Sequence, residues 1–246
     1  MRPDPTSSLI ERHPEKVHDA PEYRQRVCVF EDRRHAGAEL AKMLQDHKSG
    51  RGLVLAIPAG GVPVGVSLAG WLGLPVDALC ISKITIPGNT EVGCGAVAFD
   101  GSIELNIPLI RRLGLGGEAL HERIEKTRAK VKRRQEELRP GWPPLRPDGR
   151  DVFLVDDGLA SGFTMRLAVK AVRKLAPARV AVAVPTAPTS SVADLLDRAD
   201  DIYCANLRSG GRFAVADAYR SWRDVDEAEA ARMLRRAGQR GPSFRG

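Results

Sequence analysis

The sequence predicts an α/β fold: an open, mostly parallel, twisted sheet with helices on both faces. Short apolar runs that fit buried strands alternate with segments of helical periodicity, as in a series of βαβ units. One of these strands ends in two aspartates and a small-residue turn that leads into a helix. The 246 residues are 43% apolar and 28% charged, which fits a globular protein with one large domain.

The first third of the chain supplies the first helices and strands. Residues 1–25 are polar, carry prolines and lack periodicity, so they are expected to form a flexible arm. Apolar residues at helical spacing predict a helix over residues 35–47. The run LVLAI at residues 53–57 predicts a buried strand, and a helix begins near Pro63. A second apolar run ends at Lys83, and a long glycine-bearing loop then returns to a strand.

The remainder begins with a long, charged amphipathic helix over residues 117–138, with apolar residues along one side: Leu120, Ile124, Val131 and Leu138. A proline-rich connector follows at residues 139–150. Strand, tight loop and helix are then expected from Val152, followed by further strands at 179–185 and 201–207 and helices at 190–199 and 226–237.

The positive charge is concentrated in two segments. The net charge is +7, and residues 111–150 hold 12 Lys/Arg against 6 Asp/Glu. Residues 235–246 hold four arginines and no acidic residue, so the rest of the chain is close to neutral. Such segments can bind nucleic acid or phosphorylated ligands, or form a solvated helix face and a frayed terminus.

Several classes of protein do not fit the sequence. No apolar run approaches the ~20 residues of a membrane-spanning helix, and the N-terminus has no apolar core of a signal peptide. The four cysteines are scattered without a C-x-x-C pair or a zinc-ligand spacing. We therefore expect a cytoplasmic protein with reduced thiols and no membrane contact.

The most informative stretch is the strand, turn and helix at residues 152–165. Asp156 and Asp157 fall at the carboxyl end of the strand, where ligands bind in open α/β sheets. The turn then opens a helix whose free N–H groups suit an anion, and Ser161 and Thr164 add hydroxyl donors. Two carboxylates beside an anion site must face hydroxyls or a cation, so a sugar phosphate with Mg²⁺ fits both halves. The alternative is a plain turn with Ser161 as the helix N-cap.

The sequence VFLVDDGLASGFTM resembles the signature loop of type I phosphoribosyltransferases, which bind 5-phosphoribosyl 1-pyrophosphate (PRPP). The resemblance covers about residues 28–235. It includes FEDRRHAGAELA, IPAGGVPVG, SKITIPGNTEVGCGAV and RFAVADAY, which are similar to blocks of one prokaryotic branch of that family. It implies one phosphoribosyltransferase-like domain over residues 26–235, with a small hood and the long charged helix. A basic, flexible tail would follow at residues 236–246.

The resemblance also implies roles for the residues around the two aspartates. Asp156 and Asp157 would contact the ribose hydroxyls and, with Lys83, take part in catalysis. The 5-phosphate would be bound by Ala160, Ser161, Gly162, Phe163 and Thr164. Carboxylates near the ribose stabilise the positive charge that develops at the anomeric carbon. Mg²⁺ would arrive on PRPP, lie near the aspartates without direct protein ligands, and help pyrophosphate to leave.

A second glycine-containing segment resembles the family's pyrophosphate loop. In Pro58–Gly61, the residues Ala59, Gly60 and Gly61 would bring backbone amides to the leaving group. Relatives commonly carry Arg where this chain has Ala59. Pyrophosphate binding would then rest on amides, Mg²⁺ and cations from elsewhere in the chain. Lys83 falls where relatives carry a basic pair that reaches PRPP or a neighbouring subunit.

Two further resemblances concern the lid and the acceptor. Residues 87–95 resemble a mobile loop that closes over the site and excludes water. Phe213 falls where relatives stack an aromatic ring on the acceptor base. The plainer interpretations are an inert surface loop and a core phenylalanine.

These features predict a Mg²⁺-dependent transferase of nucleotide metabolism that moves phosphoribose from PRPP to a nitrogen acceptor, such as a purine or pyrimidine base in salvage. The protein could form a homodimer. The main alternative is a PRPP- or nucleotide-sensing regulator that binds nucleic acid through its basic segments. A phosphatase that uses Asp156 as its nucleophile is disfavoured, because phosphatases of the haloacid dehalogenase type carry D-x-D-G-T near the N-terminus.

Overall fold

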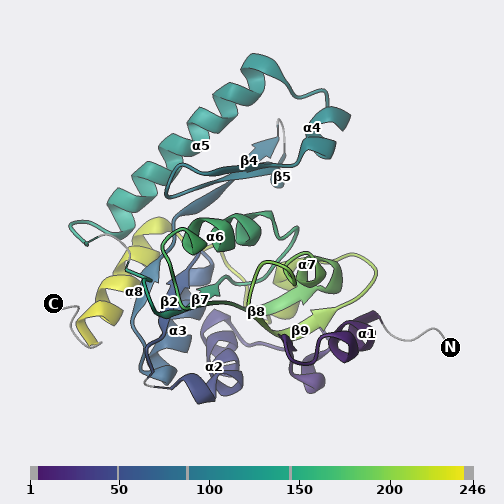
Figure 1. The fold of residues 1–246 in the computed structure, drawn as a ribbon, viewed down its shortest axis with the longest axis vertical. Coiled ribbons are helices and arrows are strands. Elements are labelled where there is room, and N and C mark those ends of the chain that lie inside the picture. Colours follow the sequence, from purple (N-terminus) through teal and green to yellow (C-terminus); the bar gives the residue numbers. More distant parts are fainter. Residues whose placement is uncertain (1–4, 49, 87–88, 144–145, 241–246) are drawn as a thin grey trace.

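The computed structural model describes residues 5–48, 50–86, 89–143 and 146–240, which form a parallel sheet with a smaller hood beside it (Figure 1). The sheet has six strands in the order β1-β9-β8-β7-β2-β3, and every pairing within it is parallel. Its strands are β1 (Val17–His18), β2 (Leu53–Ala56), β3 (Val76–Ala78), β7 (Asp151–Val155), β8 (Arg179–Pro188) and β9 (Asp201–Arg208). The predicted α/β fold class is confirmed.

Helices cover both faces of this sheet, because its central strands are apolar on both sides. One face packs against α2 (Arg33–Met43), α3 (Gly61–Leu72) and α8 (Glu227–Arg240). The other packs against α6 (Phe163–Arg173) and α7 (Thr189–Ala193). Three short 3₁₀ helices complete this part: η1 (Pro21–Tyr23), η2 (Gln45–His47) and η3 (Val215–Ala218).

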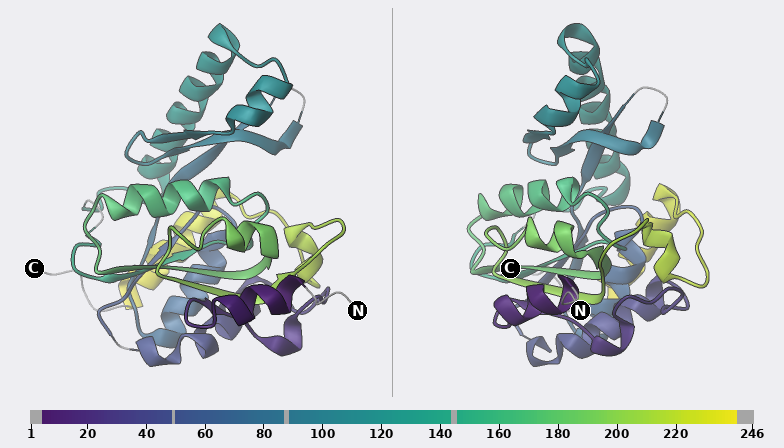
Figure 2. Two further views of the ribbon diagram at one scale, coloured as in Figure 1. Left: turned by 45° about the vertical axis from the view of Figure 1, so that its right-hand side comes forward. Right: turned by 90° about the vertical axis from the view of Figure 1, so that its right-hand side faces the viewer.

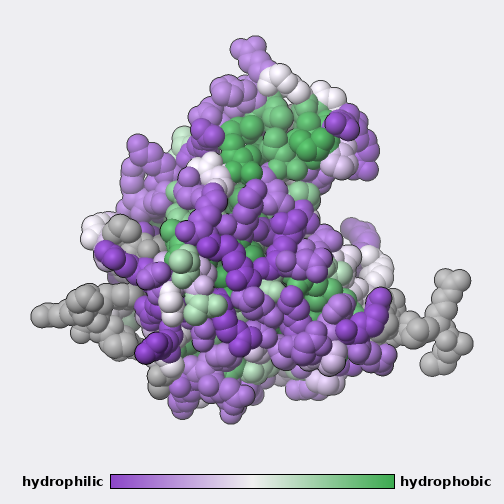
Figure 3. Space-filling view, in the orientation of Figure 1, coloured by the Kyte–Doolittle hydropathy of each residue, from purple (hydrophilic) through white to green (hydrophobic). Residues whose placement is uncertain are grey.

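The hood is a separate antiparallel sheet with two helices (Figure 2). It consists of β4 (Ile81–Ile86), β5 (Asn89–Ala98), β6 (Ile103–Leu105), α4 (Ile107–Arg112) and α5 (Gly117–Leu138). The long helix α5 has the predicted bounds. Apolar residues gather on the surface of the hood (Figure 3), and Ile107 and Leu113 are more than 40% exposed.

The sequence predicts one strand for the apolar run that ends at Lys83, but in the structure this run forms two strands. Its first part is β3 in the parallel sheet, and its second part is β4 in the hood. Leu79 and Cys80 join the two and are buried, so the run is apolar throughout although the chain changes sheets. Lys83 therefore lies within β4 and not at the end of a strand.

Two boundary predictions are wrong. The segment expected to be a flexible arm contains α1 (Pro5–Arg12) and the edge strand β1, which pairs with β9. Leu9 and Val17 are buried, and these two apolar side chains attach an otherwise polar segment to the sheet. At the other end, α8 continues past residue 235 to Arg240 because Ala230 and Leu234 are fully buried against the body. Residues 241–246 lie outside the described residues.

No helix in the described ranges is both long enough and apolar enough to cross a membrane.

Candidate functional site

Two loops meet at the carboxyl ends of β2 and β7. These strands are parallel neighbours, with Ala56 opposite Val155, so the segments that follow them emerge side by side. A Cβ on Gly60 would lie 2.1 Å from Asp157 Oδ2, and one on Gly61 would lie 2.8 Å from the Val155 carbonyl oxygen. Both positions therefore require glycine, since the Pro58–Gly61 segment lies directly against the carboxylate pair.

Arg33, at the start of α2, is the partner of Asp157. Its Nε donates to Asp157 Oδ2 at 2.8 Å, and its Nη1 donates to the Arg223 carbonyl oxygen at 2.7 Å. Arg33 is 7% exposed, and the central carbon of its guanidinium lies 3.8 Å from the ring centroid of Trp222. The sequence itself shows no sign of this role for Arg33, although the segment FEDRRHAGAELA, which contains it, resembles the family.

The two carboxyl groups have different electrostatic surroundings. The pKa of Asp156 is raised well above its ordinary value, first by desolvation and then by the adjacent charge of Asp157. Desolvation also raises the pKa of Asp157, but the Arg33 guanidinium opposes this effect. Asp156 Oδ1 accepts a hydrogen bond from the Asp157 amide at 2.9 Å, which fixes the pair in one geometry. Asp156 is thus the carboxyl group that takes up a proton more readily, while Arg33 favours the ionised form of Asp157.

The aromatic side chain of Tyr219 closes the other side of this pair. Its hydroxyl donates to the Asp157 carbonyl oxygen at 2.6 Å, and it is 3% exposed. Desolvation and the nearby charge of Asp157 raise its pKa well above the ordinary value, so the phenol stays a donor. Tyr219 therefore holds the backbone of the aspartate segment in place.

The segment from Gly158 to Thr164 forms the predicted tight turn at the start of α6. Gly162 has φ +70° and is the N-cap of α6, which lacks a capping side-chain hydrogen bond. The alternative in which Ser161 is the N-cap is therefore wrong. Ser191 Oγ donates to the Ala160 carbonyl oxygen at 2.6 Å and anchors the turn to α7. No side chain caps the first amides of α6, and free amides at a helix N-terminus suit an anion.

The remaining predicted residues lie on other elements. The Phe163 ring stacks against the Arg166 guanidinium, whose central carbon lies 3.9 Å from the ring centroid. Phe213 follows β9 and is partly exposed, which excludes a core role. Lys83 is exposed on β4. Of the expected lid, residues 89–95 belong to β5 and are not a loop, and residues 87–88 lie outside the described residues.

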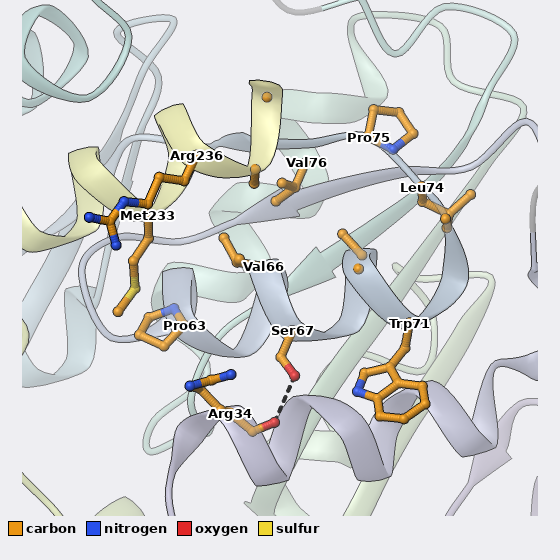
Figure 4. A pocket seen from close by; sticks show the side chains of 15 residues that line it. Arg34, Pro63, Val66, Ser67, Trp71, Leu74, Pro75, Val76, Met233 and Arg236 are labelled. Atoms are coloured by element: carbon orange, nitrogen blue, oxygen red, sulfur yellow. Dashed lines mark hydrogen bonds between the residues drawn. The ribbon is translucent and has the colours of Figure 1, made fainter. Parts of the chain in front are cut away.

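A cavity of about 730 Å³ opens elsewhere, between α2, α3 and α8 (Figure 4). Pro63, Trp71 and Met233 line it, with Arg34 and Arg236 at its rim. None of the predicted site residues lines this cavity. The two predicted segments meet instead at the edge of the sheet, where the aspartates lie against the Pro58–Gly61 segment.

Comparison with known proteins agrees with this fold. The family model of the phosphoribosyl transferase domain matches residues 31–206. Two Mycobacterium tuberculosis proteins, each named "Putative phosphoribosyl transferase", are 33% identical over 209 residues, which is 85% of this chain and 47% of theirs. The chain thus spans about half the length of the curated relatives it matches.

A crystal structure is also similar over most of both chains. The protein TT1426 of Thermus thermophilus is 34% identical, with a TM-score of 0.67, and the match covers 83% of this chain and 97% of that one. This chain belongs to the phosphoribosyl transferase family.

Proposed function

We propose that the protein transfers the phosphoribosyl group of PRPP to a nitrogen acceptor and releases pyrophosphate, with Mg²⁺ as cofactor. The observation that carries this proposal is the carboxylate pair between two loops of different kinds. One loop ends at the N-terminus of α6, and the other contains Gly60 and Gly61 in contact with the pair. A ligand with a phosphate at one end, hydroxyls in the middle and pyrophosphate at the other end matches that order.

The residues of the site suit each part of PRPP. The N-terminal amides of α6, with the Ser161 and Thr164 hydroxyls, would bind the 5-phosphate. The ionised Asp157 carboxylate would accept hydrogen bonds from the ribose hydroxyls, while Arg33 holds it in place. As the bond to pyrophosphate breaks, positive charge develops at the anomeric carbon, and a fixed carboxylate beside the ring stabilises it.

The donor set also fits a divalent cation that arrives with its ligand. Among the described residues, no group of three or more His, Cys, Asp or Glu side chains gathers around one point. Two adjacent desolvated carboxylates suit a cation that already carries phosphate oxygens. Bound Mg²⁺ would neutralise charge on the departing pyrophosphate, and Asp156 and Asp157 would be its nearest carboxylates.

The acceptor class follows from one residue of the turn. Relatives that use 6-oxopurines carry an Asp where this chain has Ala160, and a methyl group cannot accept a proton. Phe213 is partly exposed, so its ring is available to stack on a base. We propose adenine or a pyrimidine as the acceptor, in preference to hypoxanthine or guanine.

The test is a pyrophosphate-release screen with PRPP, Mg²⁺ and each common nucleobase. We expect turnover with adenine or a pyrimidine, and a loss of about 10²-fold or more in kcat/KM in Asp157→Asn, because one preorganised electrostatic contact is lost. Asn keeps an oxygen for Arg33 Nε, so the variant should fold. Near wild-type turnover in the variant, or no pyrophosphate release with any base, would contradict the proposal.

A second candidate is a PRPP- or nucleotide-sensing regulator that binds nucleic acid. Exposed cations along α5, including Lys126, Arg128, Lys132 and Arg133, favour it, as does the absence of Arg at position 59. Binding of DNA or RNA that weakens steeply with salt, together with no pyrophosphate release, would select this function. Sedimentation of the same sample would also test the proposed homodimer.

A further inference from the structure

Arg33 uses only part of its hydrogen-bonding capacity. A guanidinium carries its N–H donors in a rigid plane, on Nε and on both terminal nitrogens. In Arg33, Nε donates to Asp157 Oδ2 at 2.8 Å, and Nη1 donates to the Arg223 carbonyl oxygen at 2.7 Å. Among the residues that the structure describes, no hydrogen bond or ion pair engages Nη2. A charged side chain that is only 9% exposed thus keeps one nitrogen unused.

The unused Nη2 lies on the side of the guanidinium that faces Asp157. The planar geometry places Nη2 on the same edge as the Nε–H bond, and a carboxylate often binds that edge at two points. Here only Nε meets Asp157. Solvent still reaches Nη2, because the fully buried side-chain polar atoms without a partner in the described chain belong to His18, Asn206 and Glu227. A ligand oxygen can therefore reach the same donor.

Asp157 brings this edge of the guanidinium to the Pro58–Gly61 segment. Its Oδ2 accepts from Arg33 Nε and lies 2.1 Å from the position that a Cβ on Gly60 would take. Arg33 and Gly60 therefore meet at one carboxylate oxygen, so an anion that lies along the segment comes within reach of the guanidinium. Because Arg33 also offsets the charge of Asp157, that anion does not face an unpaired carboxylate.

Residues 219–223 fix the plane of the guanidinium. Its central carbon lies 3.8 Å from the ring centroid of Trp222 and 5.9 Å from that of Tyr219. The Arg223 carbonyl oxygen holds Nη1 in the same segment. Trp222 is 38% exposed, so its ring covers Arg33 at the surface of the molecule. A guanidinium held in this way loses little conformational entropy when it binds a ligand.

We propose that Arg33 binds the diphosphate group of the ligand directly: Nη2 donates to one of its oxygen atoms, and Trp222 is a positioning residue that fixes the guanidinium plane. This inference rests on the proposed function. It gives a second role to the partner of Asp157, and it supplies positive charge to Pro58–Gly61, whose own side chains carry none.

The test measures the binding of three probes by calorimetry: PRPP and inorganic pyrophosphate, each with Mg²⁺, and ribose 5-phosphate. Arg33→Lys keeps the charge and can keep one contact with Asp157, but an ammonium does not reproduce the second donor of the edge. Affinity for PRPP and pyrophosphate should fall about 10-fold or more, as expected for a lost hydrogen bond between charged groups. Affinity for ribose 5-phosphate should stay close to the wild-type value, because that probe lacks the diphosphate group.

Two further variants separate this contact from an effect that passes through Asp157. Asp157→Asn can still accept from Arg33 Nε but carries no charge. The loss of pyrophosphate affinity in Arg33→Lys should therefore persist in the Asp157→Asn background, because Arg33 meets the diphosphate itself. Arg34→Lys is the matched control, since it makes the same change at the exposed neighbour and should leave all three affinities unchanged. Circular dichroism checks the folding of each variant.

The role of Trp222 is tested with the same probes. Trp222→Phe keeps an aromatic face for the guanidinium and should retain most of the pyrophosphate affinity. Trp222→Ala removes that face and should lower pyrophosphate affinity more than ribose 5-phosphate affinity, a difference that general loss of structure would not produce. Trp71→Ala is the control, because Trp71 is 66% exposed and lines the remote cavity.

The outcomes separate this inference from the proposed function. Unchanged pyrophosphate affinity in Arg33→Lys, a loss that disappears in the Asp157→Asn background, or an equal loss in Arg34→Lys would overturn the direct contact and leave the proposed function standing. A wild-type protein that binds pyrophosphate but releases none from PRPP with any base would overturn the proposed function and leave the contact standing. A wild-type protein that binds neither PRPP nor pyrophosphate would overturn both.

Discussion

At the scale of single residues, the contact between Arg33 and Asp157 sets the charge state of the site. Arg33 counteracts the desolvation that raises the pKa of Asp157. Arg33→Gln removes that counterion, so the pKa of Asp157 should rise. If turnover needs the ionised carboxylate, the acidic limb of the pH–rate profile should move to higher pH.

The measurement for this variant is kcat/KM for pyrophosphate release between pH 5 and 9. Arg34→Gln is the control, because Arg34 is the neighbouring residue, is exposed, and has its side chain at the rim of the remote cavity. An acidic limb at the same pH in Arg33→Gln and the wild type would show that Arg33 does not hold the charge of Asp157.

We expect the buried Asp156 carboxyl group to lower the free energy of unfolding at neutral pH. Its pKa is raised in the folded state, so the folded protein binds this proton more tightly than the unfolded chain does. The wild type therefore loses stability as pH rises from the ordinary value of an aspartate through the raised pKa. Asp156→Asn cannot ionise, and its side-chain oxygen can still accept from the Asp157 amide.

We therefore expect Asp156→Asn to raise the melting temperature by a few degrees at pH 7–8, with the gain shrinking towards pH 4. Thermal melts at several pH values check this. A variant that is less stable than the wild type at pH 8 would contradict it. If Asp156→Asn is more stable than the wild type, then the wild-type site keeps a carboxylate that lowers the stability of the fold, as functional sites often do.

The sequence predicted Asp156, Asp157 and both glycine-containing segments, because strand ends and turn residues are local signals. It did not predict Arg33, whose contacts lie 124 and 190 residues away in the chain. The helical periodicity places Arg33 near the start of a helix, but it does not identify the carboxylate that Arg33 contacts. Long-range pairing of this kind follows from the packing of α2 against the sheet, which only the structure provides.

At the scale of elements, the contact between the Pro58–Gly61 segment and the end of β7 leaves no room for a side chain. Gly60→Ala would place a Cβ 2.1 Å from Asp157 Oδ2, so either the segment or the carboxylate must move. We expect pyrophosphate release to fall at least 10-fold while the fold is retained, since an ångström-scale displacement in a site is costly.

Gly70→Ala is the control for this substitution. Gly70 lies inside α3, and a Cβ there meets no atom within 4 Å. Alanine should raise the free energy of unfolding by roughly 0.5–1 kcal/mol through helix propensity, with activity unchanged. Unchanged activity in Gly60→Ala would mean that the two segments do not act together.

The elements themselves were predictable to different degrees. Strands β2, β7, β8 and β9 and helix α5 have strong local patterns, and the sequence located each of them. The hood was expected only from the family resemblance, and its β4–β5 pairing was read as a loop. An apolar run does not reveal where a chain leaves one sheet for another, and Leu79 and Cys80 are as buried as the strands that they join.

At the scale of the whole molecule, ion pairs attach the hood to the body. Arg139, just beyond the end of α5, donates to both carboxylate oxygens of Asp77 on β3, each at 2.8 Å. Their side chains are 11% and 9% exposed. Arg166 of α6 reaches Glu104 of β6 at 3.3 Å. Arg134 of α5 donates to the Pro58 carbonyl oxygen at 3.3 Å, so these ion pairs help to keep α5 in place against the Pro58 segment.

The buried pair gives a prediction for the stability of the whole fold. Arg139→Gln leaves Asp77 buried without its counterion, which should lower the free energy of unfolding by about 3–5 kcal/mol at pH 7. Arg133→Gln on the same helix loses only an exposed pair with Glu137 and should cost under about 1 kcal/mol. Urea titrations of the two variants give this comparison directly.

The pH dependence identifies the cause of that loss. Desolvation already raises the pKa of Asp77 and Arg139 opposes it, so the pKa rises further in Arg139→Gln. Folded Asp77 then binds a proton more tightly than unfolded Asp77, and the variant regains stability as pH falls. The difference between wild type and variant should therefore narrow towards pH 4–5. A difference that stays constant from pH 8 to pH 4 would mean that lost packing, and not the unpaired carboxylate, weakens the attachment of the hood.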